Sequence, residues 1–184
     1  MQVLATQGLA ACTGRQVAAV GHLTKSAIHY YFADMDVLID RAMGEHVANF
    51  AANLRKAADL STDPVDSFWN VISEYLATFR DQPNITYLWL EYWVDAVRKG
   101  RLTAIDACNQ EVTAVLTERL EALDNPRPAD AAQGIFVFLL GEVLAQLSTP
   151  AHTGRTCQRI AALTGIDTAP PKPALGRFQA VPVQ

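Results

Sequence analysis

The sequence predicts an all-α protein, because apolar residues recur at helical spacing along the chain and the alternating pattern of strands does not. Residues that commonly begin helices stand directly before these segments, among them Thr13, Asp34 and Asp63. Half of the residues are hydrophobic and 18% are charged, which is enough apolar material for a buried core. We expect three short helices followed by five or six long ones.

The first short helices have the spacing of a helix-turn-helix unit. Thr13-x-x-Gln16 is a capping-box pattern that opens one helix, and Thr24 can cap a second helix over residues 25–31. About three residues, 21–23, join the two helices, which is typical of this unit. The second helix of such a unit lies in the major groove of DNA, with its first turn at the base edges.

Longer helices are expected to follow, without internal repeats. A proline stands at the start of two of them, Pro64 and Pro83, where the missing backbone N–H costs little. The expected segments run from Asp34 toward residue 58, from Pro64, from Pro83, and over residues 101–122, about 128–147 and 153–164. The tail 168–184 holds four of the nine prolines and no periodicity, and we interpret it as disordered.

The charged residues are unevenly distributed along the chain. The formal net charge of −4 argues against a nucleic-acid partner when it is taken as an average. Residues 1–33, however, contain Arg15 and Lys25 and no acidic residue at all. A locally basic end on an acidic body leaves a nucleic-acid partner open.

The cysteines and the hydropathy pattern bear on the cellular compartment. The three cysteines are far apart and form no CxxC pair, so we interpret them as small buried hydrophobic residues in a reducing environment. The N-terminus lacks the charged, apolar and small-residue order of a signal peptide. The longest apolar stretch, residues 135–147, is too short to span a bilayer and contains Glu142. We therefore expect a soluble, cytoplasmic protein.

Residues 13–43, "TGRQVAAVGHLTKSAIHYYFADMDVLIDRAM", resemble the DNA-binding segment of the TetR family of transcriptional regulators. The positions that fall into the family's register without a gap are Thr13, Val17, Ala18, Leu23, Thr24, Ile28, Tyr31, Phe32 and Leu38. The resemblance implies a helix-turn-helix head of three helices over residues 1–45. It further implies a helical ligand-binding and dimerisation bundle over residues 46–167, ahead of the tail 168–184.

The resemblance also implies double-stranded DNA as a partner, bound at a palindromic operator by a homodimer. Lys25 and Ser26 would face the base edges, whereas His29 and Tyr30 would flank the groove near phosphate oxygens. The full set of candidate DNA-binding residues is Thr13, Arg15, Thr24, Lys25, Ser26, Ala27, His29 and Tyr30. The very apolar helix near residues 134–147 would pair across the dimer axis, although a buried helix of a monomer has the same pattern.

The head departs from the family's pattern at several positions. Gly21-His22 replaces the usual Ala-Gly turn, His29 replaces a phosphate-contacting tyrosine, and Met35 replaces a lysine. Loss of that lysine removes about one counterion-release unit, so we expect weaker DNA affinity or a greater reliance on base contacts. The first helix enters the pattern midway and is expected to be truncated, so that either the natural start lies upstream of Met1 or the head is partly destabilised.

In the body, residues 85–98 loosely resemble BetI-like members of the TetR family. The candidate ligand-binding residues are Trp69, Trp89, Tyr92, Trp93, Phe136 and Glu142. Trp89 and Trp93 lie on one helical face with Tyr92 beside them, and such a face could hold a flat or cationic ligand. An aromatic stripe of plain core would have the same spacing. Glu142 would either orient a ligand or face solvent at the subunit edge.

No catalytic, metal-binding or cofactor-binding pattern is found in the sequence. The four histidines are scattered, and HExxH, GxSxG, P-loop and GxGxxG patterns are absent from the sequence. We interpret the acidic run Asp34, Asp36 and Asp40 as solvated charges on a helix face. The absence of these patterns argues against an enzyme, and the family resemblance implies a ligand-responsive repressor. The alternative is a helical small-molecule-binding or interaction dimer whose head is degenerate and does not bind DNA.

Overall fold

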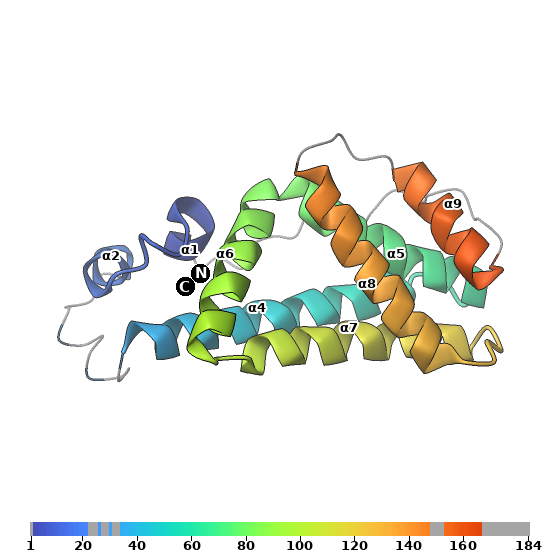
Figure 1. The fold of residues 1–184 in the computed structure, drawn as a ribbon, viewed down its shortest axis with the longest axis horizontal. Helices are drawn as coiled ribbons and strands as arrows, with labels where there is room; N and C mark the ends of the chain where they lie inside the picture. The colour runs from blue at the N-terminus through green and yellow to red at the C-terminus, as the bar shows by residue number, and fades with distance from the viewer. Residues whose placement is uncertain (1, 22–25, 27–29, 31–33, 148–152, 167–184) are drawn as a thin grey trace. The chain divides into compact units, whose positions relative to one another are not determined.

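The computed structural model describes residues 2–21, 26, 30, 34–147 and 153–166. Within these ranges the chain forms helices and no strand, which confirms the predicted all-α fold (Figure 1). The helices are α1 (Gln2–Gln7), α2 (Gly14–Val20), α4 (Met35–Ala58), α5 (Pro64–Asp81), α6 (Pro83–Lys99), α7 (Thr103–Glu121), α8 (Pro128–Gln146) and α9 (Thr153–Thr164). Ser26 and Tyr30 are also helical.

Three of the predicted helix starts are capped as the sequence indicates. The side-chain oxygens of Thr13, Asp34 and Asp63 each accept a hydrogen bond from the backbone N–H three residues further on, at 3.3, 2.9 and 2.9 Å. Each bond satisfies one of the backbone donors that a helix start leaves unpaired. Pro64 takes the first position of α5, as expected. The predicted cap at Thr24 lies outside the described residues.

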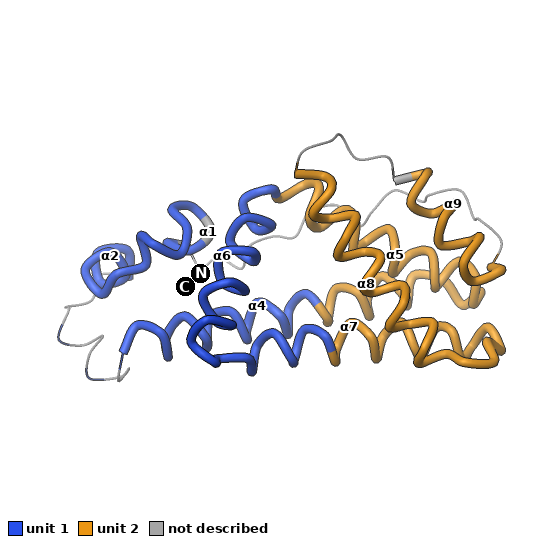
Figure 2. The backbone as a smooth tube through the Cα atoms, viewed as in Figure 1, with its two compact units in different colours: residues 1–50, 83–109 blue, residues 51–82, 110–184 orange. Residues whose placement is uncertain are grey.

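The chain divides into two compact units, which Figure 2 shows in different colours. Unit 1 consists of residues 1–50 and 83–109, and unit 2 consists of residues 51–82 and 110–184. Helices α4 and α7 therefore contribute to both units. The predicted division at residue 45 falls inside α4, and the head, body and tail boundaries stay a prediction.

Unit 1 joins the N-terminal helices to α6 and the first part of α4. Helix α1 packs against α2 and against α6. The buried apolar side chains of this unit include Val3, Leu4, Ala18, Ile39, Met43, Val47, Leu88, Tyr92, Ala96 and Ile105. Because α1 contains only six residues, it depends on this packing for its stability.

Unit 2 is built around α5, which packs against α8 and α9, and these two helices also contact each other. Eleven residues of α5 are buried, so this helix is enclosed over most of its circumference. The buried apolar side chains of the unit include Leu54, Phe68, Ile72, Tyr75, Leu76, Leu116, Leu120, Leu139 and Ile160.

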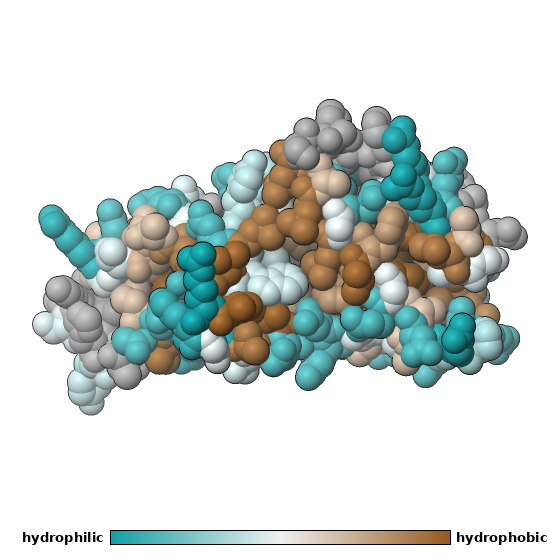
Figure 3. Space-filling view, viewed as in Figure 1, coloured by the Kyte–Doolittle hydropathy of each residue, from teal (hydrophilic) through white to brown (hydrophobic). Residues whose placement is uncertain are grey.

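Helix α8 is apolar on both its buried and its exposed sides. In the described part of the chain it is the one helix long and apolar enough to cross a membrane, by length and composition alone. Its buried residues are Ala132, Ile135, Phe136, Leu139 and Val143. Val137 and Leu144 are exposed, and Figure 3 shows apolar surface over this helix.

Candidate functional site

The predicted DNA-binding residues that the structure describes are exposed. Thr13 caps α2, and Arg15 lies on the exposed side of its first turn. Ser26 is exposed, and Tyr30 is the most exposed of the large hydrophobic residues described, at 84%. The other four candidates, Thr24, Lys25, Ala27 and His29, lie outside the described residues. Contact with DNA stays a prediction for all eight.

The end of α1 is held against α6 by a backbone-to-carboxylate hydrogen bond. The Leu9 N–H donates to Glu91 Oε2 at 2.9 Å. Gly8 precedes it with a φ of +79°, a left-handed conformation that favours glycine. A Cβ atom at Gly8 would also lie 3.0 Å from Glu91 Oε2. The backbone angle therefore favours glycine at this position, and any larger residue would also have to displace the Glu91 carboxylate.

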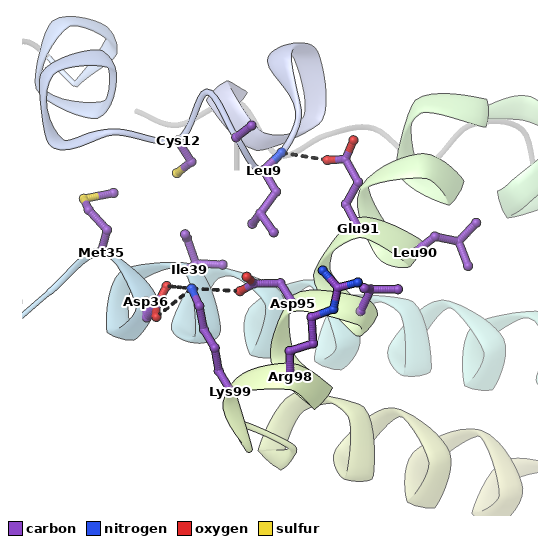
Figure 4. A pocket seen from close by; sticks show the side chains of 12 residues that line it. Leu9, Cys12, Met35, Asp36, Ile39, Leu90, Glu91, Asp95, Arg98 and Lys99 are labelled. Atoms are coloured by element: carbon purple, nitrogen blue, oxygen red, sulfur yellow. Dashed lines mark hydrogen bonds and ion pairs between the residues drawn. The ribbon is translucent and has the colours of Figure 1, made fainter.

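A pocket of about 700 Å³ lies beside this contact, within unit 1 (Figure 4). Its walls come from the loop after α1, the first turns of α4, and α6. Leu9, Ile39 and Val94 supply apolar surface. Met35, at the position where the family resemblance places a lysine, also lines this pocket. Arg98 and several ion-paired side chains form its charged part.

An ion-pair network connects the start of α4 to the end of α6. Arg101 pairs with Asp40, with Asp95 at 2.6 Å and with Asp36 at 3.7 Å. Lys99 pairs with Asp36 at 3.0 Å and with Asp95 at 3.2 Å. The Arg101 side chain is only 17% exposed, so its charge is poorly screened by water. This cluster holds two helices together whose residues are far apart in the sequence.

Tyr92 completes the network from the buried side of α6. Its hydroxyl donates to Asp40 Oδ1 at 2.9 Å, and its ring centroid lies 6.0 Å from the Arg101 guanidinium carbon. Burial, followed by the neighbouring Asp40, raises the pKa of Tyr92, so the hydroxyl stays a proton donor. The interpretation of Asp36 and Asp40 as solvated charges is therefore wrong. Only tertiary contacts with residues 92–101 could have revealed their partners.

The aromatic ligand candidates are divided between the two units. In unit 1, the Trp89 ring lies 5.9 Å from Tyr92 and 6.3 Å from Trp93, measured between ring centroids. In unit 2, Trp69 packs edge-on against Phe68 at 5.0 Å, and Phe136 is buried in the face of α8. Trp89, Tyr92, Trp69 and Phe136 are all buried. Their ligand-binding roles stay predictions.

Glu142, the predicted carboxylate on the apolar helix, has partners on α9. Its Oε2 accepts a hydrogen bond from Thr156 Oγ1 at 2.6 Å, and its Oε1 lies 3.5 Å from Arg159 Nη1. The side chain is 21% exposed. These contacts balance its charge inside unit 2. Whether it also orients a ligand stays a prediction.

A row of buried polar residues on α5 was missed by sequence reasoning. Ser67, Asn70, Glu74 and Thr78 follow one another at intervals of three, four and four residues, so they share one face of the helix. All four are buried. The interval pattern is visible in the sequence, but a polar face of this kind normally indicates contact with solvent. Burial alone distinguishes the two cases.

The members of this row differ in how their polar atoms are satisfied. Ser67 Oγ donates to the Ala58 carbonyl oxygen at 2.9 Å, and Thr78 Oγ1 donates to the Glu74 carbonyl oxygen at 2.9 Å. Glu74 Oε2 is buried and has no hydrogen-bond partner among the described residues. Burial, followed by the charge of Asp81, raises the pKa of Glu74.

No protein-family model matches the sequence, and no curated protein matches it. The fold is nevertheless shared with solved structures. SCO7518, a candidate transcriptional regulator from Streptomyces coelicolor A3(2), is similar over 89% of this chain and 92% of its own, with a TM-score of 0.73 at 16% identity. PfmR, a TetR family transcriptional regulator from Thermus thermophilus, is similar over 96% of each chain, with a TM-score of 0.58 at 15% identity. The chain has the TetR-like all-α fold.

Proposed function

We propose that the protein is a DNA-binding transcriptional regulator, acting as a ligand-responsive repressor that binds a palindromic operator as a dimer. The observation that carries this proposal is a combination of fold and register. The chain shares its fold with a TetR family regulator over 96% of its length. Residues 13–43 independently resemble that family's head segment, with nine positions in its register.

The head would bind DNA through the start of its second helix-turn-helix element. Lys25 and Ser26 would reach base edges, whereas Arg15, His29 and Tyr30 would contact the sugar-phosphate backbone. The exposure of Ser26 and Tyr30 supports this assignment. The absence of acidic residues from the first 33 positions supports it too, because a carboxylate there would repel phosphate.

The dimer would form through the exposed apolar side of α8. Val137 and Leu144 lie seven residues apart, two helical turns along one side of this helix, and are exposed in the single chain. Burial against a second copy would remove this apolar surface from water. A two-fold dimer would then present two recognition helices about 34–36 Å apart, which matches one turn of DNA.

An effector would act by shifting the population of head positions. The network of Asp36, Asp40, Asp95, Lys99 and Arg101 links the end of α6 to the first turns of α4, which belong to the predicted head. A ligand that prefers one arrangement of the body would move α4 through this link and change the spacing of the two heads. The operator would then be released.

The proposal is tested by selecting fragments of the source genome with purified protein and measuring their affinity by fluorescence anisotropy. We expect a palindrome with two half-sites about one DNA turn apart. If Lys25 also touches phosphate, Lys25→Ala should weaken binding to all sequences alike and lower the salt slope by about one unit per protomer. Ser26→Ala should instead change which bases are preferred. Lys56→Ala, which removes the same charge at an exposed position of α4, is the matched control and should leave affinity unchanged.

Failure to select any fragment, by a protein that sedimentation shows to be a dimer, would contradict the proposal. That outcome would favour the alternative of a small-molecule-binding dimer with a degenerate head. The loose BetI-like resemblance of residues 85–98 stays a prediction and plays no part in this test.

A further inference from the structure

Helix α5 is the most enclosed helix of unit 2, yet it carries most of the buried polar side chains that the structure describes. Of the six buried polar or charged residues in the described part of the chain, four lie on α5: Ser67, Asn70, Glu74 and Thr78. Their shared face turns toward protein and not toward solvent. A buried polar group lowers the stability of the folded protein unless it has a hydrogen-bond partner.

Glu74 is the member of the row whose charge is not balanced. Its side chain is 6% exposed, its Oε2 has no hydrogen-bond partner, and it forms no ion pair with any described residue. The charged group that raises the pKa of Glu74, after burial, is Asp81, which has the same sign. Arg80, the cation closest to it along α5, pairs with Asp81 at 2.8 Å.

The contrast with Glu142 argues against a purely structural role. Both glutamates lie on helices of unit 2, but Glu142 receives a hydroxyl hydrogen bond from Thr156 and faces Arg159. A structural carboxylate is stabilised in this way, because its neighbours supply donors. Glu74 instead has Asn70 one turn before it and Thr78 one turn after it, but neither donates a hydrogen bond to its carboxylate, and Thr78 Oγ1 donates to the Glu74 carbonyl oxygen.

We propose that Asn70, Glu74 and Thr78 form the recognition wall of the effector site and that the effector carries a cationic, hydrogen-bond-donating group. An ammonium, amidinium or guanidinium group supplies both the missing counter-charge and the missing donors. A neutral ligand supplies donors and leaves the charge uncompensated. This inference rests on the proposed function, since it names the effector class of a ligand-responsive regulator.

The test uses three cations and their neutral counterparts of similar shape. The pairs are benzamidinium with benzamide, phenylguanidinium with phenylurea, and benzylammonium with benzyl alcohol. Binding to the full chain is measured by isothermal titration calorimetry at pH 7.5. We expect at least one cation to bind about tenfold or more tightly than its neutral counterpart, because a charged hydrogen bond is worth about that ratio.

Variants assign the preference to Glu74. Glu74→Gln keeps the shape and removes the charge, so it should bind both members of the pair alike. Glu74→Asp keeps the charge and should retain the preference with lower affinity. Glu111→Gln removes the charge of a unit 2 glutamate that pairs with Arg55 and is the matched control, in which the preference should be unchanged. A circular-dichroism melting curve for each variant verifies that it is folded.

Three results would overturn the inference: equal binding of the cation and its counterpart, a preference that survives in Glu74→Gln, or no binding of any of the three cations. Operator binding is measured separately, without any probe. If the operator is bound and cation selectivity fails, the effector class is wrong and the regulator proposal stands. If cation selectivity holds and no DNA is bound, the regulator proposal is wrong and the cationic ligand class stands.

Discussion

The aspartate cluster of unit 1 and Glu74 of unit 2 differ in whether their charges are paired. In unit 1, Asp36, Asp40 and Asp95 gather around Arg101 and Lys99, and each of these three carboxylates has a cation within reach. In unit 2, Glu74 on α5 has an oxygen with no partner among the described residues. The unit 1 cluster is partly open to water, whereas the side chain of Glu74 is almost fully enclosed.

The two cases compare carboxylates that are paired with cations and a buried carboxylate that is not. A part-buried ion pair ties two elements together because removing either member leaves an uncompensated charge. An unpaired buried carboxylate holds no second element in place and opposes folding, since burial disfavours its ionised form. Removing a member of the unit 1 cluster should therefore lower the free energy of unfolding. Removing the charge of Glu74 should raise it.

The largest effect is expected from Arg101→Met, which leaves the three aspartates without their central cation. We expect the free energy of unfolding to fall by roughly 2–4 kcal/mol, because the remaining charges stay part-buried. Urea denaturation followed by circular dichroism measures it. Arg55→Met breaks the half-exposed pair with Glu111 and serves as the control, with an expected loss of at most about 1 kcal/mol. Equal losses in the two variants would show that the cluster has no special role.

Glu74→Gln should have the opposite sign. The folded-state pKa of Glu74 is raised, so at low pH the acid is neutral in both states and the substitution changes little. As the pH rises, the unfolded chain ionises first and the wild type loses stability, which glutamine avoids. We expect the variant to be more stable by roughly 1–3 kcal/mol at pH 7.5 and about equal below pH 4. A destabilised variant at neutral pH would mean that Glu74 is ionised and paired in the folded protein.

Tyr92→Phe should cause a smaller loss. The change removes the hydrogen bond to Asp40 and keeps the buried ring, while Asp40 retains Arg101. We expect a decrease of about 0.5–1.5 kcal/mol in the free energy of unfolding, measured by urea denaturation. A loss as large as that of Arg101→Met would show that the hydroxyl, and not the guanidinium, organises the cluster.

Arg41→Ala should have the smallest effect. Arg41 pairs with Glu45 one turn further along α4, and both side chains are largely exposed. We expect a change within about 0.5 kcal/mol that disappears at high salt, because an exposed pair is screened. Unfolding curves at low salt and at about 1 M salt measure it. A larger or salt-independent loss would mean that exposure does not determine how much an ion pair contributes to the stability of this protein.

The helices that the sequence predicts best are those with local start signals. Asp34 and Asp63 were expected to begin helices, and each caps one. Pro83 was expected to open another, and it does. These signals act within a few residues, so they can be read without knowledge of the rest of the chain.

The site residues were predicted less completely, for two physical reasons. Asp36 and Asp40 have the spacing of a solvated face, and their partners come from residues 92–101, whose proximity no local pattern encodes. Glu74 belongs to a polar row that resembles a solvent-facing surface. Only the packing of α8 and α9 against α5 shows that this helix is enclosed.

By itself the sequence determined the all-α class and the helix starts at Thr13, Asp34 and Asp63. Each of these depends on interactions between residues no more than about one helical turn apart. The tertiary structure alone decided which charged side chains are paired and which are buried without a partner. Arg101 and Asp40 are 61 positions apart, and burial depends on everything that packs around a side chain. The cost of a charge is set by that surrounding protein and not by its neighbours in the chain.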